Sequence, residues 1–201
     1  MVIAVSVHWL RYVAAVLALA LVFPSGNGMA IERSINLPAE KRTKLEKYVT
    51  ARGAYDLVQR ERSKVLFLDV RTRAEIVTVG MTREVDGHIP YVDFNEFWEW
   101  DNAASRFKLD LNQEFGQAVA LHLARKKLSK DDKIILMCRS GDRSARAVNL
   151  LADLGYTNVY SVFEGFEGDL TPEGRREVNG WKNSLLPWSY ELDRSKVYPL
   201  N

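Results

Sequence analysis

Residues 133–144 read Lys-Ile-Ile-Leu-Met-Cys-Arg-Ser-Gly-Asp-Arg-Ser. The first five residues form a short apolar run of the length and composition of a buried strand, and this run ends directly on Cys138. From Arg143 or Ser144 to Leu154, apolar side chains recur on one helical face, and Gly155 follows as a helix end. The stretch therefore predicts a buried strand, a short polar loop and a helix, in that order.

The same alternation of elements continues on both sides of this stretch. Val65 to Leu68 and Val159 to Phe163 predict further strands, while helices are predicted from the cap Thr50 to Val58 and from Phe115 to Leu128. Alternating strands and helices predict an α/β fold with a doubly wound parallel sheet and helices on both faces. In such sheets ligands bind at the carboxyl ends of the strands. Four segments are expected at that edge: residues 69–71, the segment after Phe94, the Cys138 loop and the segment after Phe163.

Cys138 is the only cysteine of the 201 residues, so an internal disulfide is excluded. The chain has only three histidines beside it, so a metal cluster built on Cys and His is excluded as well. A helix start, two arginines and two serines close to the sulfur favour a thiolate nucleophile and an anion site. The alternative is a buried cysteine that only packs, but a packing residue has no need of these polar neighbours. The predicted binding loop consists of Arg139, Ser140, Gly141, Asp142, Arg143 and Ser144.

The net charge of the chain and the composition of its first 30 residues limit its partners and its location. The formal net charge of +2 comes from 28 basic and 26 acidic residues without long runs, so neither a nucleic-acid surface nor a polybasic membrane patch is expected. Residues 1–30 combine one Arg, a short apolar run and small residues, as in a cleaved export signal, and the run is short for a membrane span of about 20 residues. We therefore expect a periplasmic protein that contacts the membrane only if this segment stays uncleaved. The predicted organisation is a signal peptide at 1–30, a leader at 31–47, one domain at 48–190 and a tail at 191–201.

Four short motifs occur in a fixed order: Leu66-Phe67-Leu68-Asp69-Val70-Arg71, Gly87-His88-Ile89-Pro90, residues 138–144, and Gly180-Trp181-Lys182-Asn183-Ser184-Leu185-Leu186-Pro187. Together they cover about residues 48–188 and resemble the successive signatures of the rhodanese family. The resemblance implies a rhodanese-like α/β domain without a cofactor. It also implies that Cys138 takes sulfur from a donor such as thiosulfate, holds it as a persulfide cradled by the loop amides, and passes it to cyanide or a thiol.

The resemblance also suggests roles for residues around Cys138. Arg139 and Arg143 are expected to attract an anionic donor. Asp69 and Arg71 match a family element, for which we expect loop support, with an exposed strand-end ion pair of little consequence as the alternative. For His88 a structural role in its turn is favoured over proton transfer.

The chain departs from the family pattern by insertions at residues 77–86, 94–107 and 169–179. The second insertion contains Phe97, Trp98 and Trp100, which are expected either to select the acceptor or, the favoured interpretation, to cover the sheet edge as ordinary core. Asp142 places a negative side chain beside the predicted anion site. It is harmless if it points outward and argues against thiosulfate if it points inward.

Two rival functions remain open. Cysteine-dependent phosphatases and arsenate reductases also hold a thiolate in an amide cradle, but they place an Arg at the position that Ser144 occupies here. Because Arg143 comes one residue earlier, the loop encloses a smaller space, better matched to one sulfur atom. The second rival is a non-catalytic module that carries a persulfide or binds a partner.

Overall fold

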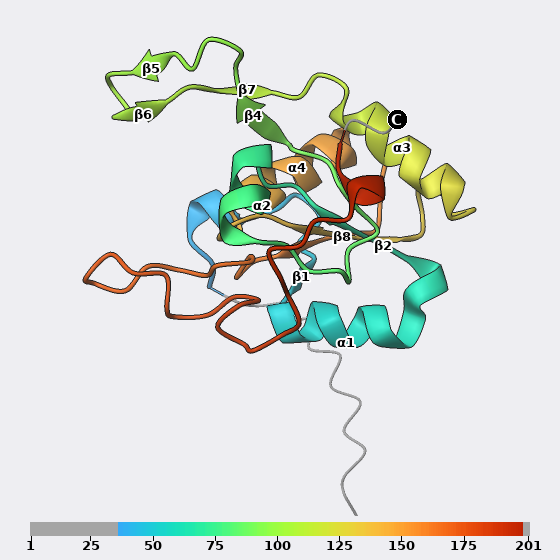
Figure 1. Ribbon diagram of the computed structural model, residues 1–201. Helices are drawn as coiled ribbons and strands as arrows, with labels where there is room; N and C mark the ends of the chain where they lie inside the picture. The colour runs from blue at the N-terminus through green and yellow to red at the C-terminus, as the bar shows by residue number, and fades with distance from the viewer. Residues whose placement is uncertain (1–35, 199–201) are drawn as a thin grey trace, which may run out of the picture.

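The computed structural model describes residues 36–198 of the chain. Its centre is a five-stranded sheet in the order β1-β9-β8-β2-β3, in which every neighbouring pair is parallel (Figure 1). The predicted export signal at residues 1–30 lies outside the described residues. The strands of the sheet are β1 (Tyr48–Val49), β2 (Val65–Asp69), β3 (Gly87–His88), β8 (Lys133–Met137) and β9 (Val159–Val162).

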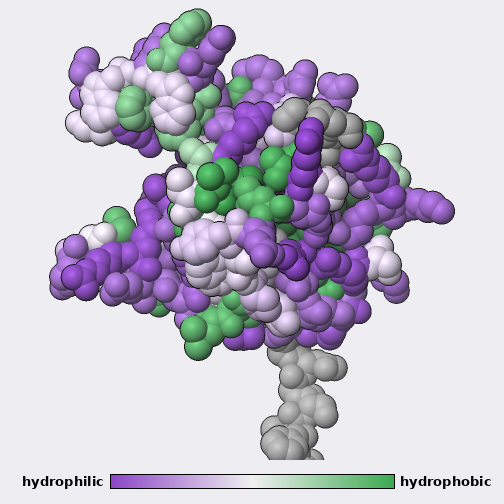
Figure 2. Space-filling view, in the orientation of Figure 1, coloured by the Kyte–Doolittle hydropathy of each residue, from purple (hydrophilic) through white to green (hydrophobic). Residues whose placement is uncertain are grey.

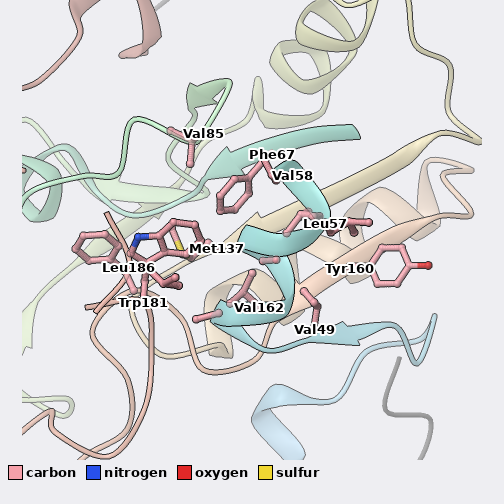
Figure 3. Close-up of a cluster of buried hydrophobic side chains, with 14 of the residues drawn as sticks. Val49, Leu57, Val58, Phe67, Val85, Met137, Tyr160, Val162, Trp181 and Leu186 are labelled. Carbon is pink, nitrogen blue, oxygen red and sulfur yellow. The ribbon is translucent and has the colours of Figure 1, made fainter. Parts of the chain in front are cut away.

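Both faces of the sheet are covered, which confirms the predicted α/β architecture. Alternate residues of the buried strands point to opposite faces, so each strand contributes to two separate apolar cores. One face packs against α1 (Ala51–Glu61) and α2 (Arg73–Val79), and the other against α3 (Phe115–Arg125) and α4 (Asp142–Asp153). The first core surrounds the fully buried Trp181, whose ring centroid lies 5.6 Å from that of Phe67 (Figure 3).

Local sequence signals fix most element ends close to their predicted places. The Thr50 side chain accepts a hydrogen bond from the Gly53 amide at 2.9 Å and so caps α1. The helix predicted to reach Leu128 ends at Arg125, and in the described residues 36–47 of the charged leader the only helix is the short 3-10 helix Ala39–Lys41. Lys41 of this leader is bound to Asp169 at 2.5 Å, which fastens the leader to a distant part of the domain.

Two segments project from the same side of the molecule (Figure 1). The first is a ribbon in which β4 (Val92–Phe94) pairs with β7 (Leu109–Leu111) and β5 (Trp100–Asp101) pairs with β6 (Arg106–Phe107), both antiparallel. The ribbon is separate from the main sheet, whose edge strand beside β2 is β3. The second projection contains the inserted residues 169–179, and a notch separates the two in the space-filling view (Figure 2).

Within residues 36–198, no helix combines the length and the apolar character needed to cross a lipid bilayer.

Candidate active site

The Cys138 loop joins the carboxyl end of β8 to the start of α4, as the sequence predicts. Gly141 adopts a φ of 100°, and a Cβ atom at this position would lie 2.1 Å from the carbonyl oxygen of Phe163. A side chain is therefore excluded on two grounds, the left-handed backbone and the close approach of the neighbouring segment. This glycine lets the chain turn tightly enough to place its amide against the sulfur.

The Cys138 side chain is fully buried beneath its loop. Its Sγ accepts a hydrogen bond from the Gly141 amide at 3.1 Å and lies 3.5 Å from the Ser144 hydroxyl. Ser144 in turn is 2.9 Å from the hydroxyl of Ser161 on β9, a buried contact that the sequence did not reveal. The Ser144 hydroxyl accepts from the Cys138 thiol and donates to the Gly141 carbonyl at 3.1 Å, so the Gly141 amide is the group that stabilises negative charge on the sulfur from inside the protein.

Asp142 also approaches the sulfur. Its Oδ1 lies 3.8 Å from Cys138 Sγ, and its Oδ2 accepts a hydrogen bond from Arg146 at 3.3 Å. Of the two orientations considered from the sequence, the inward one is therefore present, with its charge shared by an exposed arginine. As expected for the inward orientation, this carboxylate argues against thiosulfate as the donor, and its pairing with Arg146 moderates the effect.

Arg143 differs from its expected role as an attractor of the donor. Its guanidinium is almost fully buried and binds both carboxylate oxygens of Glu75, each at 2.6 Å. Glu75 also completes a capping box with Thr72 at the start of α2. Burial alone would raise the pKa of Glu75, but the hydrogen bonds and charge of Arg143 outweigh it and lower that pKa to about 2. Arg143 therefore ties α4 to α2, and its charge is satisfied inside the protein.

Asp69 and Arg71 form an ion pair at the end of β2, but a fully buried one rather than the exposed pair considered from the sequence. Arg71 Nη2 lies 2.6 Å from Asp69 Oδ2 and also donates to the Gly80 carbonyl at 2.8 Å. The Arg71 guanidinium stacks on the Phe166 ring at 3.8 Å, and the Phe166 amide donates to the Cys138 carbonyl at 2.8 Å. The pair thus supports the Cys138 loop indirectly, through Phe166.

His88 lies at the end of β3 and is fully buried. Its Nε2 donates to the Arg71 carbonyl at 2.8 Å. Burial lowers the pKa of this imidazole and keeps it neutral near pH 7. These contacts agree with a structural role in the turn.

A cavity of about 570 Å³ opens between the projecting ribbon and the Cys138 loop. The ribbon contributes Trp100 and Phe107, and the loop contributes Arg139, whose side chain is 45% exposed. The favoured prediction that the inserted aromatic residues form ordinary core is wrong, because Phe97 is 77% exposed and Trp98 51% exposed. The Trp98 ring stacks on Phe94 at a centroid distance of 4.4 Å and meets Phe107 edge-on, along a ribbon that stands away from the sheet.

Sequence reasoning missed two residues of this site. Glu75 carried a signal, the capping pattern Thr72-x-x-Glu75, but that pattern indicates only a helix start. Ser161 carried none, because a serine inside an apolar run does not show which neighbour it meets.

Comparison with known proteins places this geometry in a family. The family model of the rhodanese-like domain matches residues 50–170. An uncharacterized protein of Rickettsia prowazekii is 33% identical over 128 residues, which are 64% of this chain and 85% of that protein. The thiosulfate sulfurtransferase GlpE of Tolumonas auensis is 38% identical over 42 residues, which are 21% of this chain and 40% of GlpE. Among solved structures, Rv0390 from M. tuberculosis matches with a TM-score of 0.52 and 27% identity over 72% of this chain and 100% of that one.

Proposed function

Because this chain belongs to the rhodanese-like family, we propose that it is a sulfurtransferase that carries one sulfur atom on Cys138 as a persulfide. The observation that carries the proposal is the position of Cys138 Sγ. It lies at the start of α4, 3.1 Å from the Gly141 amide, beneath loop residues that line the cavity. A buried sulfur with a fixed amide donor suits the storage of negative charge on a terminal sulfur atom.

The reaction has two steps. In the first, the Cys138 thiolate attacks the outer sulfur of thiosulfate, a sulfur–sulfur bond forms, and sulfite leaves with the electron pair of the broken bond. In the second, cyanide or a thiolate attacks the outer sulfur of the persulfide, takes that sulfur as thiocyanate or a new persulfide, and releases the Cys138 thiolate. Neither step needs an added oxidant or reductant.

Thiosulfate is the donor that we propose. The inward Asp142 carboxylate argues against it, but Arg146 shares the charge of that carboxylate. Arg139 at the mouth of the loop offers a cation to a dianionic donor. The likeness to GlpE, a protein named for this activity, supports the same donor over a short segment of the chain. The cavity is much larger than thiosulfate, so its remaining volume can take the acceptor.

Phosphate chemistry is the weaker alternative. A cysteine-dependent phosphatase needs an arginine that faces the bound oxyanion, whereas Arg143 is committed to Glu75 by two hydrogen bonds of 2.6 Å. The Asp142 carboxylate oxygen, 3.8 Å from the sulfur, does not separate the two functions, because it repels phosphate and thiosulfate alike.

Intact mass measurement after incubation with thiosulfate tests the proposal. The protein is expected to gain the mass of one sulfur atom, and Cys138→Ser is expected to gain none. Absence of the gain with any sulfane donor, together with hydrolysis of an aryl phosphate, would overturn the proposal. Thiocyanate formed from cyanide then separates turnover from a dedicated persulfide carrier, which would load once and release nothing.

Export remains part of the proposal. Sequencing the N-terminus of protein recovered from the periplasm is expected to give a mature chain that starts near residue 31. A chain that still begins at Met1 would contradict cleavage.

A further inference from the structure

The inserted residues 169–179 are connected to the Cys138 loop through backbone contacts. Arg139 presents its carbonyl oxygen to the amides of Glu167 at 3.0 Å and Gly168 at 3.2 Å. The Gly168 carbonyl in turn accepts a hydrogen bond from Arg176 Nη1 at 2.6 Å. A single residue, Gly168, therefore links the Arg176 guanidinium to the backbone of Arg139, although 37 positions of sequence separate the two arginines.

Arg176 is held firmly in this place. Its carbonyl accepts a hydrogen bond from Asn183 Nδ2 at 3.0 Å, and its backbone bridges to Leu170 across the base of the insertion. Asn183 also binds the carbonyl oxygens of Glu167 at 3.0 Å and Asn179 at 2.7 Å. One amide side chain thus ties the insertion to the segment that lines the Cys138 loop.

The two arginines carry charge that the surrounding residues neutralise only in part. No carboxylate of residues 36–198 lies within 4.0 Å of the Arg176 guanidinium. Arg139 Nε is 3.8 Å from Glu75 Oε1, but both oxygens of that carboxylate are already bound by Arg143 at 2.6 Å.

The electrostatics of Arg176 reflect its position. Burial and then the positive charge of Arg139 lower its pKa, while three carboxylates farther away, Glu167, Asp169 and Asp142, act in the opposite sense. Two like charges beside one loop, the exposed Arg139 and the partly buried Arg176, repel each other, and an anion between them makes the arrangement favourable.

We propose that Arg139 and Arg176 together form a subsite for the trigonal oxyanion end of the sulfur donor, the sulfonate of thiosulfate or the sulfite that leaves. This assignment rests on the proposed function and adds to it a residue from an insertion that no motif of the sequence singled out. Guanidinium groups present fork-shaped pairs of N–H donors that match two oxygens of such a group. The subsite orients the outer sulfur toward Cys138 Sγ and stabilises the negative charge that sulfite acquires as the bond breaks.

Two reactions of Cys138 test the subsite, and one of them needs no sulfur transfer. The first is the rate of mass gain from thiosulfate at concentrations below saturation. The second is the ratio of the alkylation rates with iodoacetate and iodoacetamide, in which Sγ displaces iodide from an anionic or a neutral reagent of similar size. Arg176→Gln is compared with Arg175→Gln, which removes the same charge from the adjacent, exposed position of the same insertion.

Arg176→Gln is expected to slow thiosulfate loading by about tenfold, because one hydrogen bond to a charged group is lost. The same change is expected to lower the ratio of the iodoacetate rate to the iodoacetamide rate. Arg175→Gln is expected to change neither, and Arg176→Lys, which keeps the charge and one donor for the Gly168 carbonyl, is expected to recover part of both. Equal behaviour of Arg176→Gln and Arg175→Gln in both reactions would overturn the subsite while leaving sulfur transfer intact. A wild-type protein that takes no sulfur but loses its iodoacetate preference in Arg176→Gln would overturn the proposed function and support the anion subsite.

Discussion

Replacement of Glu75 by Gln is expected to cost the protein about 3 kcal/mol of unfolding free energy at pH 7. The pKa of Glu75 falls from 4.5 to about 2 in the folded protein, and at about 1.36 kcal/mol per pKa unit this fall corresponds to about 3 kcal/mol. A second estimate agrees with this value. Loss of one partner of a buried pair costs roughly 3–5 kcal/mol, because the remaining charge, here Arg143, stays buried without compensation.

Urea unfolding curves measure this cost, and repeating them at several pH values shows how the contribution of Glu75 to stability changes with pH. Because folding lowers the pKa of Glu75, the stability it contributes is complete above pH 4.5 and is lost as the pH falls toward about 2. The advantage of the wild type over Glu75→Gln is therefore expected to shrink over that window.

Asp153→Asn serves as the matched control for Glu75→Gln. It breaks the exposed pair with Lys44, 2.5 Å long, and is expected to cost less than about 1 kcal/mol. In a double-mutant cycle, Glu75→Gln with Arg143→Gln is expected to cost less than the sum of the two single changes. The reasoning is refuted if Glu75→Gln costs no more than Asp153→Asn, or if its difference from the wild type is the same at pH 6 and pH 3.

Three further changes test other parts of the structure. Trp181→Ala is expected to cost roughly 3–5 kcal/mol in urea unfolding and Trp98→Ala less than about 1 kcal/mol, because the first ring is fully buried and the second half exposed; similar costs would contradict the exposed ribbon. Asp142→Asn removes a carboxylate oxygen 3.8 Å from Cys138 Sγ and is expected to speed sulfur loading from thiosulfate at pH 7, followed by intact mass; a slower variant would show that the carboxylate assists the reaction instead. Gly141→Ala brings a Cβ within 2.1 Å of a carbonyl oxygen and is expected to lower both the unfolding free energy and the fraction of protein that loads sulfur; wild-type loading would refute the need for a bare backbone here.

Local sequence patterns predicted the sheet and the position of Cys138 because both depend on short-range signals, an apolar run followed by a polar loop and a helix. They did not predict the partner of Arg143. Glu75 lies 68 positions earlier, and only the packing of α2 beside the start of α4 brings the two together. The ribbon was misjudged for a related reason. A cluster of aromatic residues in the sequence can belong to a core or to an exposed ribbon, and composition does not distinguish the two. The pairing of β4 with β7 rather than with the main sheet, which decides the matter, is visible only in the structure.

The pairing of Arg143 with Glu75 changes which charges of the loop can act on a substrate. Loop length alone favours one sulfur atom over a tetrahedral oxyanion, and the burial of Arg143 gives an independent reason, because a guanidinium held by two short hydrogen bonds cannot also bind a phosphate. The same pairing leaves Arg139, whose side chain is 45% exposed, as the exposed cation of the loop. A second cation that binds an anionic donor therefore has to come from a segment outside the loop. Arg176 can supply this second cation because the inserted residues 169–179 place it against Gly168, which is itself bound to Arg139. In this arrangement the residues of the loop hold the sulfur, and an insertion outside the loop helps to hold the donor.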